Sequence, residues 1–247
     1  MARIPPGPSS QPSPLADRNQ NLLLAALPGD VYTRVQRSLT AVRVTLRQVL
    51  QEAHAPIDHV YFPSGGFCSI VTLLEGGRMI EVATIGREGA VGATSALSDL
   101  ATPTATMVQG KMGPCFAMTV DAFRKEMDRR GPFYELVTHH MQALINVAMQ
   151  STACNAVHSV DQRLARWLLT AADHMESDAF DLTQEFAAMM LGASRQTVTL
   201  AAGALQKAGA LRYQRGHVTI VDRAALERAS CECYRTIVKL NRGAPKR

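Results

Sequence analysis

A glycine between two amphipathic segments constrains this chain more than any other feature. Apolar residues recur every three to four positions in residues 186–191 and again in residues 198–205, which is the period of an α-helix. Gly192 separates the two segments and tolerates the left-handed backbone of a tight turn, and Ser194 is a favourable cap for the second helix. The sequence therefore predicts two short helices joined by a tight turn.

Beyond the second helix the apolar period changes from about four to two. Alternating apolar residues flank the short polar segment 215–217, with Leu211 and Tyr213 before it and Val218 and Ile220 after it. This alternation predicts a two-stranded hairpin with its turn at the polar segment. Two helices, a tight turn and a following hairpin make a helix-turn-helix with a wing.

The first turn of the second predicted helix carries side chains that suit DNA. Arg pairs bidentately with guanine and Gln with adenine, and the first turn of a recognition helix reaches the major groove. We therefore expect Arg195, Gln196 and Thr197 to read bases, Ser194 and Thr199 to contact the DNA backbone, Thr183 and Gln184 to hold phosphate, and Arg215 or His217 to anchor the wing. The alternative is a solvated first turn on a small helical domain, because any helix can begin with these residue types. The turn, the hairpin and the charge together favour DNA.

Positive charge is concentrated in the same part of the chain. Residues 181–247 contain eleven Lys or Arg and five Asp or Glu, a net charge of +6, whereas the whole chain carries +5. The first 180 residues are therefore at −1, and the basic excess lies wholly in the segment that has the pattern of a DNA reader. Double-stranded DNA is the expected partner.

Composition argues against a membrane protein and a secreted one. The chain has 247 residues, 47% hydrophobic and 19% charged, which is an ordinary globular balance and long enough for two domains. It has no run of about eighteen apolar residues, so no membrane span is predicted, and its first residues lack the apolar stretch of a secretion signal. We expect a cytoplasmic protein with reduced thiols, because its five cysteines are odd in number and mostly scattered.

Cys231 and Cys233 are the exception to that scatter. Two positions apart on a predicted helix, their side chains point in different directions, so a shared metal needs other ligands or an unwound turn. Structural or surface thiols are the favoured interpretation, and no metal site is predicted.

The first half of the chain has the pattern of a small β domain. Residues 1–20 are rich in Pro and Ser and predict a disordered arm, and residues 21–50 suggest short helices broken at Pro28 and Gly29. Strand-like runs punctuated by glycine turns follow at residues 57–62, 67–74, 79–85, 104–108 and 115–118. This pattern is typical of an antiparallel barrel or roll, which we place at residues 21–130.

One glycine-rich loop in this domain is a weak candidate for an effector site. Gly86, Arg87, Glu88 and Gly89 begin it, but the spacing is neither a dinucleotide fingerprint nor a phosphate-binding loop. A turn between a strand and a short helix is the favoured interpretation. Backbone amides before a helix nevertheless make this the best small-molecule candidate in the sequence.

A long helix is predicted at residues 131–158. Seven of its residues alternate in steps of four and three, as in a coiled-coil seam: Phe133, Val137, His140, Leu144, Val147, Ser151 and Cys154. The seam predicts a dimerisation helix, although burial against the chain's own β domain would satisfy the same pattern. His139 and His140 are expected at this seam or beside it rather than on a metal.

The remainder is assigned to a DNA-binding domain at residues 159–235 and a basic tail at residues 236–247. A helix after residue 158 directs Leu164 and Trp167 inward, with Arg163 and Arg166 on its other face. One further amphipathic helix is predicted at residues 223–240.

This order of elements resembles the Crp/Fnr family of bacterial transcription regulators. The most specific segments are residues 56–63, 86–89, 161–168, 182–185 and 192–198. The resemblance implies an α+β fold: an N-terminal antiparallel β-roll of the cyclic-nucleotide-binding type, a long dimerisation helix and a C-terminal winged helix-turn-helix. It also implies a homodimer on a near-palindromic promoter site, RNA polymerase as a partner, and an effector-sensing roll.

Departures from the family pattern leave the effector and cofactor unknown. Gln196 replaces the family's usual Glu in the recognition helix, which shifts base preference from cytosine towards adenine. The cyclic AMP signature is missing, since Gly92 precedes Ala93 and no Arg or Lys occurs between Glu88 and Gly110. No cysteine precedes Cys68, so the family's N-terminal iron–sulfur site is absent. Haem, a cyclic dinucleotide, a redox thiol or no ligand remain open.

Two other classes of function compete with a DNA-binding regulator. A cyclic nucleotide or cyclic dinucleotide sensor acting through a protein partner would use the winged domain as an interaction module, and its binding need not weaken as salt rises. An enzyme has little support, because the sequence has no nucleophile motif and no paired carboxylates on one helix face, so no catalytic residue is predicted.

Overall fold

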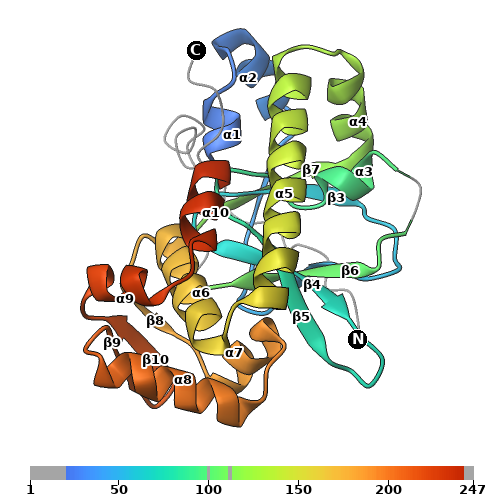
Figure 1. The fold of residues 1–247 in the computed structure, drawn as a ribbon. Coiled ribbons are helices and arrows are strands. Elements are labelled where there is room, and N and C mark those ends of the chain that lie inside the picture. Colours follow the sequence, from blue (N-terminus) through green and yellow to red (C-terminus); the bar gives the residue numbers. More distant parts are fainter. Residues whose placement is uncertain (1–20, 99–100, 111–112, 242–247) are drawn as a thin grey trace. The chain divides into compact units, whose positions relative to one another are not determined.

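The computed structural model describes residues 21–98, 101–110 and 113–241 (Figure 1). These residues divide into two compact units. The first contains residues 21–68 and 85–142, and the second contains residues 69–84 and 143–241. The predicted disordered arm and the last six residues of the predicted tail lie outside the described residues, and the predicted domain boundaries stay a prediction.

Short helices and strands build the first unit. Its helices are α1 (Leu22–Ala25), α2 (Gly29–Gln36), α3 (Ala93–Ala96) and α4 (Val120–Asp128). Its strands are β1 (Thr40–Val42), β2 (Val49–Gln51), β3 (His59–Pro63), β6 (Thr104–Gln109) and β7 (Cys115–Thr119). Three elements continue from one unit into the other: β4 (Phe67–Leu73), β5 (Met79–Ile85) and the long helix α5 (Pro132–Val157).

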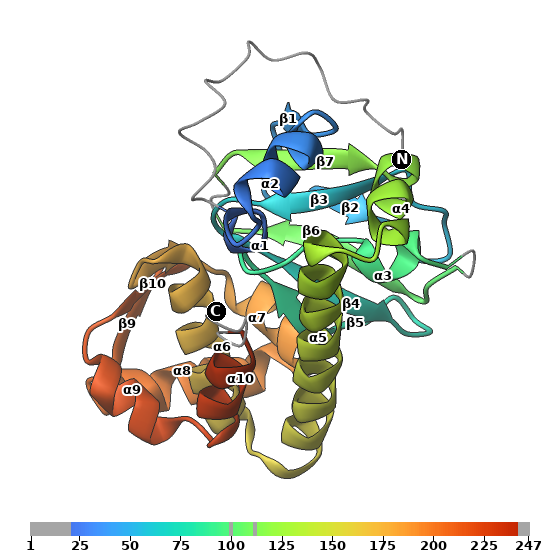
Figure 2. The ribbon, with the colours of Figure 1, turned by 90° about the horizontal axis from the view of Figure 1, so that it is seen from above.

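Two sheets confirm the predicted roll. One has the order β1-β7-β3 (Figure 2). Its β3–β7 pair is antiparallel and runs from His59 opposite Thr119 to Pro63 opposite Cys115. The other has the order β2-β6-β4-β5. The five strand-like runs of the sequence correspond to β3, β4, β5, β6 and β7. The prediction of helices throughout residues 21–50 is wrong, because β1 and β2 occupy its second half.

The core of the first unit is built on aromatic side chains. Phe62 from β3, Phe123 from α4 and Phe133 from α5 are each at most 1% exposed. The Phe123 and Phe133 rings meet edge to face with centroids 5.7 Å apart, an arrangement that aromatic pairs prefer. Val137, one turn further along α5, is buried in the same cluster.

The predicted seam of α5 is therefore buried within its own chain. Phe133 and Val137 pack into the core of the first unit, and Val147 packs with Ala83 and Ile237 in the second. Burial against the chain's own β domain, the alternative recognised from the sequence, accounts for Phe133 and Val137, while Ile237 of the last helix adds to the contacts of Val147. A different stripe of α5 is exposed, and it includes Ile145 and Met149.

The second unit contains the predicted helix-turn-helix and wing. Its elements are α6 (Val160–Met175), β8 (Ala179–Asp181), α7 (Gln184–Leu191), α8 (Arg195–Lys207), β9 (Leu211–Gln214), β10 (His217–Ile220), α9 (Arg223–Ala229) and α10 (Cys233–Asn241). The wing has three strands in the order β8-β10-β9 rather than the two predicted. The third strand is only three residues long and lies far from the hairpin in sequence, so its pairing was not apparent.

Two further expectations for the second unit are wrong. The single helix predicted at residues 223–240 is interrupted between α9 and α10, because Ser230 adopts an extended backbone. Arg166 does not lie on an exposed face of α6, since it is 7% exposed. No helix among the described residues combines the length and the apolar character needed to span a membrane.

Candidate nucleic-acid interface

The turn between α7 and α8 forms as the glycine predicts. Gly192 has a φ of 59° and ends α7 in the left-handed conformation. The Gly192 and Ala193 amides donate to the carbonyls of Met189 and Ala188, which satisfies acceptors at the end of the helix. Arg163 of α6 donates to the Leu191 carbonyl at 3.1 Å. A cation at a helix C-terminus is favourable, so Arg163, which the sequence placed only on the outer face of its helix, helps to hold the turn.

Ser194 fixes the first turn of α8. Its Oγ accepts a hydrogen bond from the Thr197 amide at 3.1 Å, and the hydroxyls of Ser194 and Thr197 lie 2.8 Å apart. Arg195 and Gln196 are exposed and make no side-chain hydrogen bond to the described part of the chain. The opposite face of α8 is anchored in the core through Val198, which is fully buried. The first turn of α8 is therefore held in place from its buried side, while the polar groups of Arg195 and Gln196 remain available to bind a ligand.

The two helices are also joined on their exposed side. Thr199 donates to the Gln184 side-chain oxygen at 2.7 Å and lies 2.8 Å from the Arg195 carbonyl. Thr183 caps α7 by accepting from the Phe186 amide at 3.2 Å. The structure thus brings Thr183, Gln184 and Thr199 to one surface with the first turn of α8. These three side chains also stabilise the motif itself, because Thr183 caps α7 and the Thr199–Gln184 hydrogen bond joins the two helices.

The wing is tied to the start of α7. The Leu182 amide donates to the Gly216 carbonyl at 2.7 Å, and the Tyr213 hydroxyl donates to the Leu182 carbonyl at 2.7 Å. Burial raises the pKa of Tyr213 to about 12, so it keeps the proton that it donates. His217 Nδ1 lies 2.8 Å from an Asp181 carboxylate oxygen. Sequence reasoning singled out His217 but missed Tyr213 and the partner role of Asp181, because both depend on the third strand.

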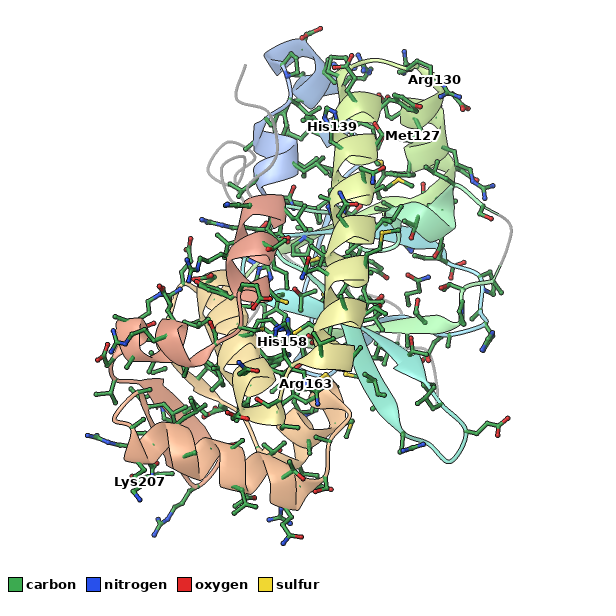
Figure 3. All side chains as sticks on the ribbon, in the orientation of Figure 1. Met127, Arg130, His139, His158, Arg163 and Lys207 are labelled. Carbon is green, nitrogen blue, oxygen red and sulfur yellow. The ribbon has the colours of Figure 1, made fainter. Side chains whose placement is uncertain are left out.

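The wing tip also presents a basic side chain. Arg215 is exposed at the turn, with a φ of 49°, and Gly216 follows with a φ of 81°. Lys207 projects outward at the end of α8 (Figure 3). Exposed cations therefore occur at both the wing and the recognition helix. In contrast, Arg223 forms ion pairs with three acidic residues of its own unit, Asp173, Asp178 and Glu227.

The glycine-rich loop does not offer a row of open backbone amides. It lies between β5 and α3, the strand-to-helix turn that the sequence favoured. The Gly86 amide donates to the Glu88 carboxylate at 2.7 Å, and the Gly89 amide donates to the Gly86 carbonyl. The Ala90 amide donates to His140 Nε2 at 3.2 Å. Since these amides are already satisfied, the argument for phosphate binding is weakened, and an effector site at Gly86, Arg87, Glu88 and Gly89 stays a prediction.

His140 explains why this loop needs a glycine. Burial lowers the pKa of His140, which keeps its imidazole neutral and able to accept from the Ala90 amide. A Cβ at position 89 would lie 2.1 Å from the His140 ring. His140 therefore serves as an internal partner of the loop, from a position on the seam of α5.

A buried carboxylate in the second unit was not predicted. Glu81 of β5 is 9% exposed and accepts hydrogen bonds from the Ser69 hydroxyl and, at 2.9 Å, from Trp167 Nε1 of α6. Burial raises the pKa of Glu81 to about 7, and the Ser69 bond, the Arg166 charge and the Trp167 bond offset part of that rise. The residue therefore titrates near neutral pH.

Comparisons with known proteins agree with this architecture. Residues 162–229 match the model of the Crp-like helix-turn-helix domain. No curated protein matches the chain. A solved structure from Eubacterium rectale, described as a putative transcriptional regulator of the Crp/Fnr family, is similar with a TM-score of 0.69 and 18% identity over 85% of this chain and 98% of that one.

Two further solved structures have the same fold. The c-di-GMP responsive global regulator CLP of Xanthomonas campestris has a TM-score of 0.65 and 14% identity, and covers 78% of this chain and 98% of its own. FixK2 of Bradyrhizobium japonicum has a TM-score of 0.65 and 15% identity over the same shares of the two chains. The resemblance inferred from the motifs is confirmed: this chain carries a Crp-like helix-turn-helix domain on the fold of the Crp/Fnr transcription regulators.

Proposed function

We propose that this protein is a transcription regulator that binds a near-palindromic DNA site as a homodimer. The observation that carries the proposal is the first turn of α8. Arg195 and Gln196 are exposed there on a helix whose start is fixed by Ser194 and whose far side is buried. Side chains held in this way reach base edges when the first turn enters the major groove.

Each predicted contact has a place in this proposal. Arg195 and Gln196 read bases, with Thr197 beside them. Ser194 and Thr199 contact the DNA backbone while also bracing the turn, and Thr183 and Gln184 at the start of α7 hold phosphate. Arg215 and His217 anchor the wing, where the Asp181 carboxylate lies 2.8 Å from His217 Nδ1 and orients the imidazole. The net charge of +6 in residues 181–247 supplies the attraction that is independent of sequence.

The exposed stripe of α5 supports the homodimer. Ile145 is 45% exposed and Met149 is 65% exposed, and Thr152 and Ala156 continue the same stripe at steps of three and four. An apolar stripe on a long helix is the surface that a second copy of the helix covers. A dimer built in this way carries two recognition helices for two half-sites. We further propose that the first unit transmits an effector signal and that RNA polymerase is a partner, as expected of regulators with this fold.

The decisive experiment is fluorescence anisotropy on DNA from the region upstream of the protein's own coding sequence, with a random duplex of equal length. Arg195→Ala should weaken binding to the upstream site by about 1–3 kcal/mol, or roughly 5- to 150-fold, and reduce the preference over random DNA. Arg228→Ala removes an exposed charge of α9 outside the recognition surface and is the matched control.

A salt series separates this proposal from a protein-binding role. The logarithm of the association constant should fall against the logarithm of salt with a slope near −0.9 for each phosphate contact. Equal losses on both duplexes would make Arg195 a phosphate contact rather than a base reader. A wild-type protein that prefers neither duplex and whose weak binding ignores salt would contradict the proposal.

A further inference from the structure

Four side chains capable of binding a metal lie together in the second unit. Cys154 is on the last turn of α5, and His158 follows one turn later, directly beyond the helix (Figure 3). Cys231 and Cys233 lie at the interruption between α9 and α10. We call these four residues the thiol–imidazole cluster. Its four ligand atoms, three Sγ and one imidazole nitrogen, all lie within 4.8 Å of one another.

The spacing of these atoms fits a single tetrahedral ion. Zinc binds Cys sulfur at about 2.3 Å and His nitrogen at about 2.0–2.1 Å, so two tetrahedral ligands lie roughly 3.5–3.8 Å apart. The Sγ atoms of Cys154 and Cys231 are 3.5 Å apart. The Cys233 Sγ and the His158 Nδ1 are 3.7 Å apart. Both distances are close to the edges of such a tetrahedron.

Neighbouring groups orient two of the ligands. The Glu232 carboxylate lies 3.2 Å from His158 Nε2. An Nε2–H that donates to this carboxylate would leave the lone pair of Nδ1 free to bind a metal beside the thiols, as in carboxylate–histidine–zinc sites. Gln150 donates its amide N–H to the Cys233 sulfur at 3.1 Å, a bond that a thiolate accepts better than a thiol.

Packing alone does not account for this arrangement. Cys154, Cys231 and Cys233 are at most 4% exposed and form a buried cluster by themselves. Three sulfurs beside an imidazole bury little apolar surface, whereas they supply the soft sulfur and nitrogen donors that zinc prefers. The His158 side chain is 13% exposed and is therefore the most exposed member of the cluster.

We propose that the thiol–imidazole cluster binds one Zn²⁺ ion in a tetrahedral site of three thiolates and one imidazole. Binding converts the three thiols to thiolates and releases their protons to solvent, and the imidazole binds in its neutral form. The site closes all four positions, so its role is structural. It joins the end of α5 to the segment between α9 and α10, and this assignment does not depend on DNA binding.

The structure provides both features that the sequence required for a metal shared by Cys231 and Cys233, an unwound turn and further ligands. On a continuous helix, Cys231 and Cys233 would diverge and could not share an ion without other ligands or an unwound turn. The chain is unwound at Ser230 to Glu232, and the other two ligands come from the end of α5. A four-iron cluster is disfavoured, because each of its cysteines binds a different iron and the sulfurs are held further apart than these are.

The first test is the metal content and spectrum of the full chain purified under reducing conditions. Wild type should hold about one zinc per chain. Replacement by Co²⁺ should give intense sulfur-to-cobalt charge-transfer bands and the visible bands of tetrahedral cobalt. Cys233→Ser and His158→Gln should weaken Zn²⁺ affinity at least about a hundredfold in competition with a chromophoric chelator. Glu232→Ala, which removes only a positioning residue, should weaken it about tenfold.

Cys68→Ala and Cys115→Ala are the matched controls, because both thiols are fully buried outside the cluster. Both variants should keep the zinc. A second measurement avoids variants that fold poorly: a mercurial thiol reagent titrated into wild type should release zinc to a metallochromic dye as the cluster thiols react. Wild type that binds Zn²⁺ and Co²⁺ no better than Cys233→Ser, or that contains iron and sulfide instead, would overturn the proposal.

Discussion

Glu81 makes the stability of the second unit depend on pH in a direction opposite to most carboxylates. Its pKa rises on folding from 4.5 to about 7 because it is buried. The folded chain therefore binds more protons than the unfolded chain between these values. Stabilisation by the protonated Glu81 is complete below about pH 4.5 and is lost as the pH rises through 7. A shift of this size corresponds to about 3 kcal/mol, most of which falls between pH 5 and pH 8.

Glu81→Gln removes this titration while keeping groups that can pair with Ser69 and Trp167. The difference in unfolding free energy between pH 5 and pH 8 should therefore be smaller in the variant than in wild type by roughly 2–3 kcal/mol. Urea unfolding followed by fluorescence measures it, because Trp167 is the chain's one tryptophan and contacts Glu81 directly. Glu75→Gln changes an exposed carboxylate of the same hairpin and should behave as wild type. Identical pH dependence in wild type and Glu81→Gln would refute the reasoning.

Two further predictions concern the dimer and the turn. Replacing Ile145 and Met149 together by Asp should raise the dimer dissociation constant, measured by sedimentation velocity, at least about tenfold. His139→Asp, which lies off the exposed stripe, is the control and should leave the constant unchanged. An unchanged constant in the double variant would place the dimer contact elsewhere. Gly192→Ala should lower the unfolding free energy in urea by about 1–2 kcal/mol, because an Ala there is strained and meets Ile80. Gly203→Ala, in open space on α8, should raise it by about 0.5–1 kcal/mol; equal effects would contradict the account of the turn.

Local patterns predicted the elements whose formation depends on nearby residues. The 3.6-residue period, the turn at Gly192 and the cap at Ser194 were enough to place α7 and α8, and the glycine turns were enough to place β4 and β5. These signals are local because a helix satisfies its own backbone and a hairpin pairs neighbouring segments.

Features that depend on distant residues were not predictable in the same way. The strands β1, β2 and β8 have three residues each and exist because β7, β6 and β10 pair with them from far along the chain. The burial of Glu81 against Trp167 joins residues 86 positions apart. Likewise, Cys154 and Cys231 are separated by 77 positions, so spacing in the sequence could not bring them to one site.

Helix α5 shows why a correct period does not identify the partner of a surface. The seven residues with coiled-coil spacing do form one face, but that face is covered by the chain itself, with Val137 in one unit and Val147 in the other. A second stripe, containing Ile145 and Met149, remains exposed. Since the two faces are separate, a charge placed on the exposed stripe should disrupt a dimer without removing contacts that fold the chain. Loss of DNA affinity in such a variant, with its urea unfolding unchanged, would then report on assembly and not on stability.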